Sequence, residues 1–190
     1  MKQILFGLLV LFLAACATVQ PSSQTGRAAF LLTDAAADMG SVTSVKVTVD
    51  SVRAHSQTEG WVTVSSEPKT YDLLALKASG DTVLLADAQL KTGTYEQVRL
   101  DISRVEITDE NGTHDAKLPS GELKIVGNVM VEANSTTAVT FDFIADESLH
   151  TTGNGEYIMA PVVQVETRED SEVDASGKSD VKVSGAVKSS

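Results

Sequence analysis

The sequence predicts an all-β protein, an antiparallel β-sandwich with one or two short helices. Short apolar segments recur along the chain with turn-forming residues between them, and several alternate apolar with polar residues. Alternation with a period of two is typical of strands that bury one face and expose the other. Helical patterns are confined to two short candidates, residues 34–39 and 145–150.

The first fifteen residues are typical of an export signal. Lys2 supplies a positive start, residues 4–13 form an apolar run, and Ala14 and Ala15 follow. The run is too short for a membrane-spanning helix, which needs about 20 apolar residues. Residues 1–15 are therefore expected to be a signal peptide.

Residues 13–16, Leu-Ala-Ala-Cys, resemble a bacterial lipobox, after which lipoprotein signal peptidase cuts once the cysteine thiol carries diacylglycerol. Cys16 is the only cysteine, so it has no disulfide partner within the chain. The alternative is cleavage by the general signal peptidase and release of a soluble protein. We expect Cys16 to hold the chain on a membrane through several acyl chains. Because Ala17 stands where an inner-membrane signal would have Asp, the resemblance implies the outer membrane of the cell envelope.

The net charge of the chain limits the classes of molecule that it is expected to bind. Removal of residues 1–15 leaves 14 Lys and Arg against 26 Asp and Glu, a net charge of −12. Such a chain is expected to be repelled by nucleic acid and by anionic lipid headgroups, so no nucleic-acid partner is predicted. Aromatic residues make up only 5% of the chain, so Val, Leu and Ile must supply most of the core.

A flexible tether and then a single domain follow the signal peptide. Residues 16–26 are polar and small, which is typical of a linker, and the domain is expected over residues 27–168. Its strands are predicted at 28–33, 45–52, 61–64, 71–76, 83–90, 97–107, 122–133, 138–144 and 157–167. This regular spacing favours a Greek-key sandwich of the immunoglobulin or transthyretin kind. Residues 169–190 are rich in Ser and charge and are predicted to be a disordered tail, with an extra edge strand as the alternative.

Local signals refine three of these segments. The apolar phase slips near Ser103 and Arg104, which predicts a bulge, and Asn111-Gly112 predicts a tight hairpin. Gly93 and Tyr95 are expected to form a tyrosine corner, in which the phenol bonds the backbone near a crossover. An ordinary core tyrosine is the alternative.

A series of short blocks resembles a known family. They include "LLTDAAAD" at 31–38, "LKTGTYEQVRL" at 90–100, "FDF" at 141–143 and "MAPVVQV" at 159–165. In this order they are similar to the uncharacterised family of prokaryotic exported lipoproteins named domain of unknown function 4382, over about residues 27–168. The resemblance implies a β-sandwich attached to the cell surface and carries no activity. Ala36 and Ile144 depart from the family pattern, which puts any shared cation site in doubt.

Catalytic motifs are missing from the sequence. The three histidines are scattered, no Gly-x-Ser-x-Gly elbow is present, and no second cysteine is available for zinc. We therefore expect a protein that is not an enzyme and has no required cofactor.

Two ligand sites are nevertheless candidates. Asp34, Asp38, Asp142 and Asp146 fall at predicted strand ends and could converge on calcium, although helix capping and solvated turns are the favoured explanation of such aspartates. Trp61 and Tyr71 flank one connection and could form a platform for a glycan. The alternative, which we expect, is that Trp61 is a buried core residue.

The sequence thus predicts a lipid-anchored β-sandwich of the cell envelope that acts as a structural or protein-interaction module. Its alternative is a ligand-binding module for glycan or calcium. Exposed aromatic residues on one sheet would favour glycan, and converging acids would favour calcium.

Overall fold

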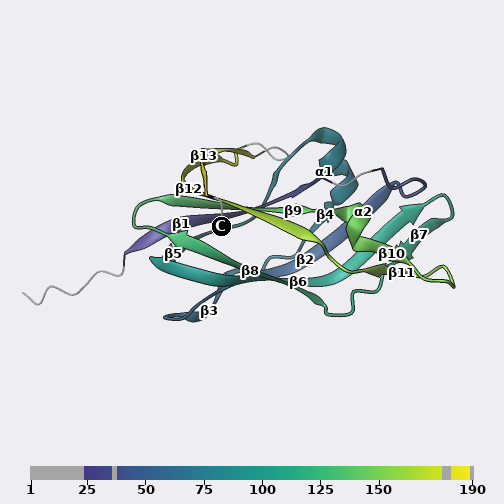
Figure 1. The fold of residues 1–190 in the computed structure, drawn as a ribbon, viewed down its shortest axis with the longest axis horizontal. Helices are drawn as coiled ribbons and strands as arrows, with labels where there is room; N and C mark the ends of the chain where they lie inside the picture. The colour runs from purple at the N-terminus through teal and green to yellow at the C-terminus, as the bar shows by residue number, and fades with distance from the viewer. Residues whose placement is uncertain (1–23, 36–37, 177–180, 189–190) are drawn as a thin grey trace, which may run out of the picture.

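The computed structural model describes residues 24–35, 38–176 and 181–188, which fold into two β-sheets packed face to face (Figure 1). The all-β sandwich predicted from the sequence is confirmed. The first sheet has the strand order β13-β12-β9-β1-β5. Its strands are β1 (Thr25–Asp34), β5 (Val83–Lys91), β9 (Thr136–Phe143), β12 (Val163–Asp174) and β13 (Lys182–Lys188).

The second sheet has the order β3-β2-β6-β7, with β4 paired to β2 and β8 paired to β6. Its strands are β2 (Ser44–Ser56), β3 (Gly60–Ser65), β4 (Lys69–Asp72), β6 (Gly93–Asp109), β7 (Gly112–Asp115) and β8 (Glu122–Val131). A small ladder joins β10 (Leu149–Thr151) to β11 (Tyr157–Met159). The helices are α1 (Leu73–Ser79) and α2 (Ala145–Ser148).

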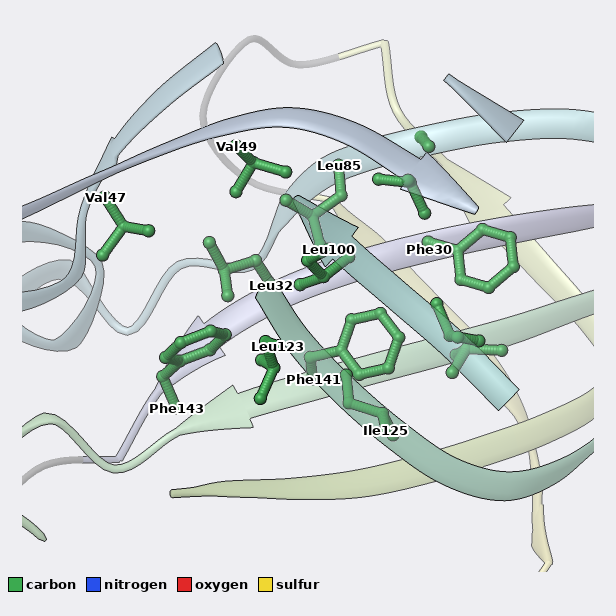
Figure 2. Close-up of a cluster of buried hydrophobic side chains, with 14 of the residues drawn as sticks. Phe30, Leu32, Val47, Val49, Leu85, Leu100, Leu123, Ile125, Phe141 and Phe143 are labelled. Atoms are coloured by element: carbon green, nitrogen blue, oxygen red, sulfur yellow. The ribbon is translucent and has the colours of Figure 1, made fainter. Parts of the chain in front are cut away.

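The core lies between the two sheets, where their alternating apolar residues meet (Figure 2). The rings of Phe30 and Phe141 stack with their centroids 6.2 Å apart, and both side chains are fully buried. Leu100 and Ile125 reach them from β6 and β8 of the opposite sheet. Burial of this apolar surface is the main stabilising contribution to the fold.

The bulge predicted near Ser103 is confirmed. Thr48 lies opposite Arg104 and Val49 lies opposite Ile102, so Ser103 is the extra residue of β6. The irregularity keeps Ile102 and Val105 both in the core although they are three positions apart. The predicted hairpin is also present, since Asp109 of β6 pairs with Gly112 of β7.

Residues 71–76, predicted as a strand, are instead divided between the end of β4 and helix α1. Asp72 caps the helix, because its carboxylate accepts a hydrogen bond from the amide of Ala75. Gly80 ends it in the left-handed conformation. Leu73 and Leu76 then face the core with helical spacing. The prediction was wrong because a run of Leu and Ala does not by itself distinguish a strand from a short helix.

The helix predicted at 34–39 is not found in its described part, because Asp34 ends β1 and Ala35, Asp38 and Met39 are not helical. The second short helix, predicted at residues 145–150, is present as α2 at residues 145–148.

Much of the chain after residue 168 forms strands, whereas the sequence predicted a disordered tail. β12 continues to Asp174, and β13 pairs with it antiparallel. Val173 and Val181 cover apolar residues on the outer face of the first sheet, among them Ala29 and Leu31. The prediction from composition was wrong, because a few valines are enough to hold this segment on the first sheet when that sheet has an apolar outer face for them to bury.

The pairing of β1 with β9 also differs from the fully antiparallel expectation. These strands run parallel, with Phe30 opposite Val139 and Asp34 opposite Phe143. The remaining ladders between named strands are antiparallel in the described part of the chain.

Candidate binding surface

The outer face of the second sheet carries three rows of side chains that run across adjacent strands. Register places one residue of each of the first two rows on β3, β2, β6 and β8 in turn, and one residue of the third row on β2, β6 and β8. Cross-strand partners point to the same face of a sheet. We call this region the Trp61 surface. Its members are Ser51, Arg53, His55, Trp61, Thr63, Gln97, Arg99, Asp101, Glu122, Lys124 and Val126.

The first row contains no full charge when histidine is neutral. Trp61 lies opposite His55, which lies opposite Gln97, which in turn lies opposite Val126. The imidazole and indole rings are 5.0 Å apart at their centroids and tilted by 56°. Trp61 is 39% exposed and Val126 is 74% exposed, so both ends of the row present apolar surface to solvent.

The second row is cationic. Arg53 lies between Thr63 and Arg99, and Arg99 lies opposite Lys124. The guanidinium carbon of Arg99 is 4.5 Å from the centroid of the Trp61 ring, and that of Arg53 is 5.6 Å away. Both are within the range in which a cation is attracted to an aromatic ring. The indole therefore packs against two guanidinium groups.

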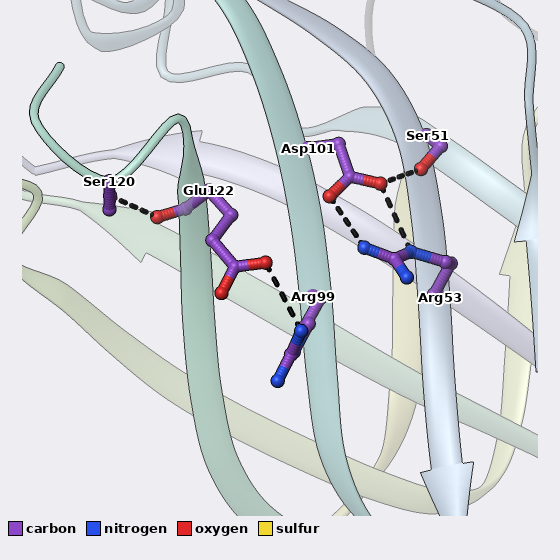
Figure 3. Close-up of polar contacts among 6 residues, drawn as sticks. All are labelled: Ser51, Arg53, Arg99, Asp101, Ser120 and Glu122. Carbon is purple, nitrogen blue, oxygen red and sulfur yellow. Dashed lines mark hydrogen bonds and ion pairs between the residues drawn. The ribbon is translucent and has the colours of Figure 1, made fainter. Parts of the chain in front are cut away.

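The third row supplies carboxylates to the second (Figure 3). Arg53 donates two hydrogen bonds to Asp101, from Nε at 3.0 Å and from Nη2 at 2.7 Å. Ser51 also donates to Asp101. These contacts, led by the hydrogen bond from Arg53, lower the pKa of Asp101. Glu122 accepts one bond of 3.2 Å from Nη1 of Arg99.

Two buried nitrogen atoms of this surface lack hydrogen-bond partners among the described residues. They are Nε of Arg99 and Nδ1 of His55. Lys124 is exposed and makes no ion pair with a described residue. The surface thus offers a ligand an aromatic ring, the exposed ammonium donors of Lys124 and carboxylate acceptors, all on one sheet face.

Trp61 is not the buried core residue that the sequence predicted. Its position opposite His55 sends it to the outer face, whereas Tyr71 lies opposite the buried Val47 and points inward. The hydroxyl of Tyr71 donates to the carbonyl of Leu84 at 3.2 Å, and burial raises the pKa of Tyr71 to about 12. The two aromatic residues therefore lie on opposite faces and do not form one platform.

The four aspartates proposed for calcium are not brought together in the described part of the chain. Asp34 lies opposite Phe143, while Asp142 lies opposite Thr33, so the two side chains point to opposite faces of the first sheet. Asp38 accepts a hydrogen bond from Gly40 in a turn, and Asp146 lies in the first turn of α2. Groups of three or more His, Cys, Asp or Glu that could hold a metal are absent among the described residues.

Asp34 and Asp142 have local structural roles. Asp34 is 5% exposed, and its Oδ1 accepts a hydrogen bond of 3.2 Å from the amide of Ala145 at the start of α2. Burial raises the pKa of Asp142, and a backbone hydrogen bond from Ala35 acts in the opposite direction. Both observations fit the alternative in which these aspartates serve the local backbone.

Gly93 and Tyr95 take part in a single backbone arrangement. Tyr95 is 2% exposed and its hydroxyl donates to the carbonyl of Lys91, four residues upstream, at 3.1 Å. Gly93 between them has a φ of +145°, which side chains rarely allow. This geometry is typical of a tyrosine corner.

Cys16 lies outside the described residues, so the lipidation prediction stays a prediction. Within the described ranges, no helix combines the length and apolarity that a bilayer span requires.

Sequence reasoning missed the arginines and Lys124. Their signal was present, because Arg53, Arg99 and Lys124 occupy outward positions in alternating strands. Only the register between strands brings them into one row, and register could not be read from any one segment.

Comparison with known proteins gives one family match. A family model described as "Domain of unknown function (DUF4382)" matches residues 25–161. The match contains the whole Trp61 surface and ends before β12 begins. No curated protein and no solved structure matches the chain.

Proposed function

Since the chain belongs to the DUF4382 family, whose description assigns no activity, we propose from its geometry that it is a non-enzymatic glycan-binding module of the cell envelope. The proposed binding site is the Trp61 surface. A lipid on Cys16 would hold the module at a membrane, in the outer membrane by the resemblance of its signal sequence.

The exposure of Trp61 is the observation that carries this proposal. A sugar ring has an apolar C–H face that can pack on an aromatic ring and a rim of hydroxyl groups that both donate and accept hydrogen bonds. Beside Trp61, the surface supplies donors from Arg99 and Lys124 and acceptors from Asp101 and Glu122. An aromatic ring with an apolar body beside polar groups suits such an amphipathic ligand.

The test is retention of the full-length chain on immobilised cell-envelope polysaccharides, compared with Trp61→Ala. We expect the substitution to abolish retention while the far-UV circular dichroism of the protein is preserved. Val187→Ala is the matched control, because Val187 is an exposed apolar residue on the first sheet. Equal retention of Trp61→Ala and the unmodified chain would refute the proposed site.

A protein partner is the second candidate, in keeping with the structural or protein-interaction role predicted from the sequence. Val126 is 74% exposed and Met130, also on β8, is 39% exposed. Exposed apolar residues near Trp and Arg are typical of protein interfaces. In this case Val126→Asp should abolish photo-crosslinking from position 130 to an envelope protein, and the unmodified chain should not be retained on the polysaccharides.

Calcium receives no support from the described residues, because the aspartates proposed to bind it are dispersed over two sheet faces and a turn.

A further inference from the structure

We infer that the glycan bound by the Trp61 surface carries carboxylates, and that a ligand carboxylate binds between Lys124 and Arg99. This inference rests on the proposed function, since it names the chemical class of the same ligand. The inference is drawn from the charges of the Trp61 surface, which has a row of cations although the molecule as a whole is acidic.

The cationic row breaks a rule of sheet stability. Arg53 lies directly opposite Arg99, and Arg99 lies directly opposite Lys124. Like charges in directly opposed positions are destabilising. Departures from local stability rules in natural proteins are expected at functional sites, where a ligand makes use of them. A row of three cations is therefore a candidate ligand contact.

The neighbouring carboxylates neutralise only part of this row. Asp101 takes two hydrogen bonds from Arg53, and Glu122 takes one from Arg99. Three cations thus face two carboxylates, which leaves one positive charge in excess at Lys124. The excess is local, because the whole chain has a formal charge of −11.

Arg99 also retains hydrogen-bonding capacity beyond its contact with Glu122. Its guanidinium bonds that carboxylate through Nη1 alone, and Nη2 makes no hydrogen bond to a described residue. Arg99 and Lys124 are direct cross-strand partners, so their charged ends can converge on one anionic group. Carboxylates form strong, charge-assisted hydrogen bonds with such donors.

A carboxylated glycan fits this arrangement better than an acidic peptide does. Extended peptides are recognised mainly through backbone bonds at a sheet edge or within a groove, whereas a sheet face offers side chains only. An acidic peptide would also bring its carboxylates close to Asp101 and Glu122 without donors to offset them. A uronic acid unit has hydroxyl donors for those two carboxylates, an apolar face for Trp61 and one carboxylate for Lys124.

The overall negative charge does not prevent such binding at physiological ionic strength. The screening length is then about 8 Å, so distant carboxylates act weakly on a ligand in direct contact with Lys124 and Arg99. Binding is therefore best measured at about 0.15 M salt.

The experiment uses the fluorescence of Trp61, which is the only tryptophan of the chain and so reports this surface alone. The full-length chain is titrated with polyuronate oligosaccharides, with the same oligosaccharides after reduction of their carboxyl groups, and with polyglutamate. We expect the polyuronate to change the emission and to bind about tenfold more tightly than its reduced form. Lys124→Gln should remove most of this difference.

Arg104→Gln is the matched control, because this substitution also removes one positive charge from the outer face of the second sheet. Arg104 pairs with Asp115 and lies at a distance from Trp61. Its affinity for polyuronate should equal that of the unmodified chain. Equal binding of the reduced oligosaccharide would overturn the inference and leave the proposed function standing. Equal binding of polyglutamate would overturn the choice of a glycan, and the absence of binding by either oligosaccharide would overturn both proposals.

Discussion

At the scale of single residues, Trp61 illustrates how strand pairing decides the role of a side chain. A lone tryptophan at the start of an apolar segment is expected in the core, yet its partner His55 is an outward residue of β2. Trp61 lies on the outer face as a result, and the core is filled by Phe30, Phe141 and Phe143. The sequence could identify Trp61 as exceptional but could not show which face of the sheet it occupies.

Trp61→Ala is expected to lower the free energy of unfolding by about 1–2 kcal/mol. Each contact between an exposed aromatic ring and a cation contributes about 0.5–1 kcal/mol, and Trp61 has two such contacts. Phe141→Ala should cost about 3–5 kcal/mol, because that ring is fully buried. Urea denaturation of both variants measures the difference, and equal losses would contradict the exposed placement of Trp61.

At the scale of secondary-structure elements, the sequence predicted most strands but not the elements that tertiary contacts decide. Strands with clear alternation, such as β2 and β9, were found near their predicted positions. Helix α1 and strand β13 were misassigned, because one depends on its caps and the other on an apolar sheet face formed by distant residues. The parallel pairing of β1 with β9 likewise has no signature within either strand.

Asp72 joins two elements, and its replacement tests how α1 is formed. Its carboxylate caps the helix at Ala75 and also accepts hydrogen bonds from the Ser44 hydroxyl at 2.6 Å and the Val45 amide at 3.3 Å. Loss of a helix cap costs about 0.5–2 kcal/mol. Because Asp72 also binds β2, we expect Asp72→Ala to cost about 2 kcal/mol in thermal or urea unfolding.

Asp81→Ala is the matched control for this prediction. The Asp81 carboxylate lies just beyond α1 and makes no hydrogen bond to another described residue. Its replacement should change stability by less than about 0.5 kcal/mol, as is usual for a surface position. If the two variants unfold alike, Asp72 does not act as the cap.

At the scale of the whole molecule, the two sheet faces have different neighbours. β13 and the end of β12 cover apolar residues on the outer face of the first sheet, whereas the outer face of the second sheet presents the Trp61 surface to solvent. Fold class could be predicted from strand periodicity alone, but this asymmetry required the register of the strands within each of the two sheets. The sequence therefore named Trp61 as a candidate for glycan binding but paired it with Tyr71, and the charged residues that surround it could be identified only from the register of the strands.

Lipid anchoring is the property that would set this module at a surface, and Cys16→Ser tests it. The lipoprotein signal peptidase acts only on a precursor whose cysteine thiol carries diacylglycerol, and serine cannot form that thioether. We therefore expect the variant to accumulate as an unprocessed precursor without acyl mass, which intact-protein mass spectrometry of membrane and soluble fractions will detect. Ala17→Ser, which keeps the thiol, should be processed and retained as the unmodified chain is. Normal processing and membrane retention of Cys16→Ser would show that the chain is exported by another route and that its binding surface is not held by a lipid.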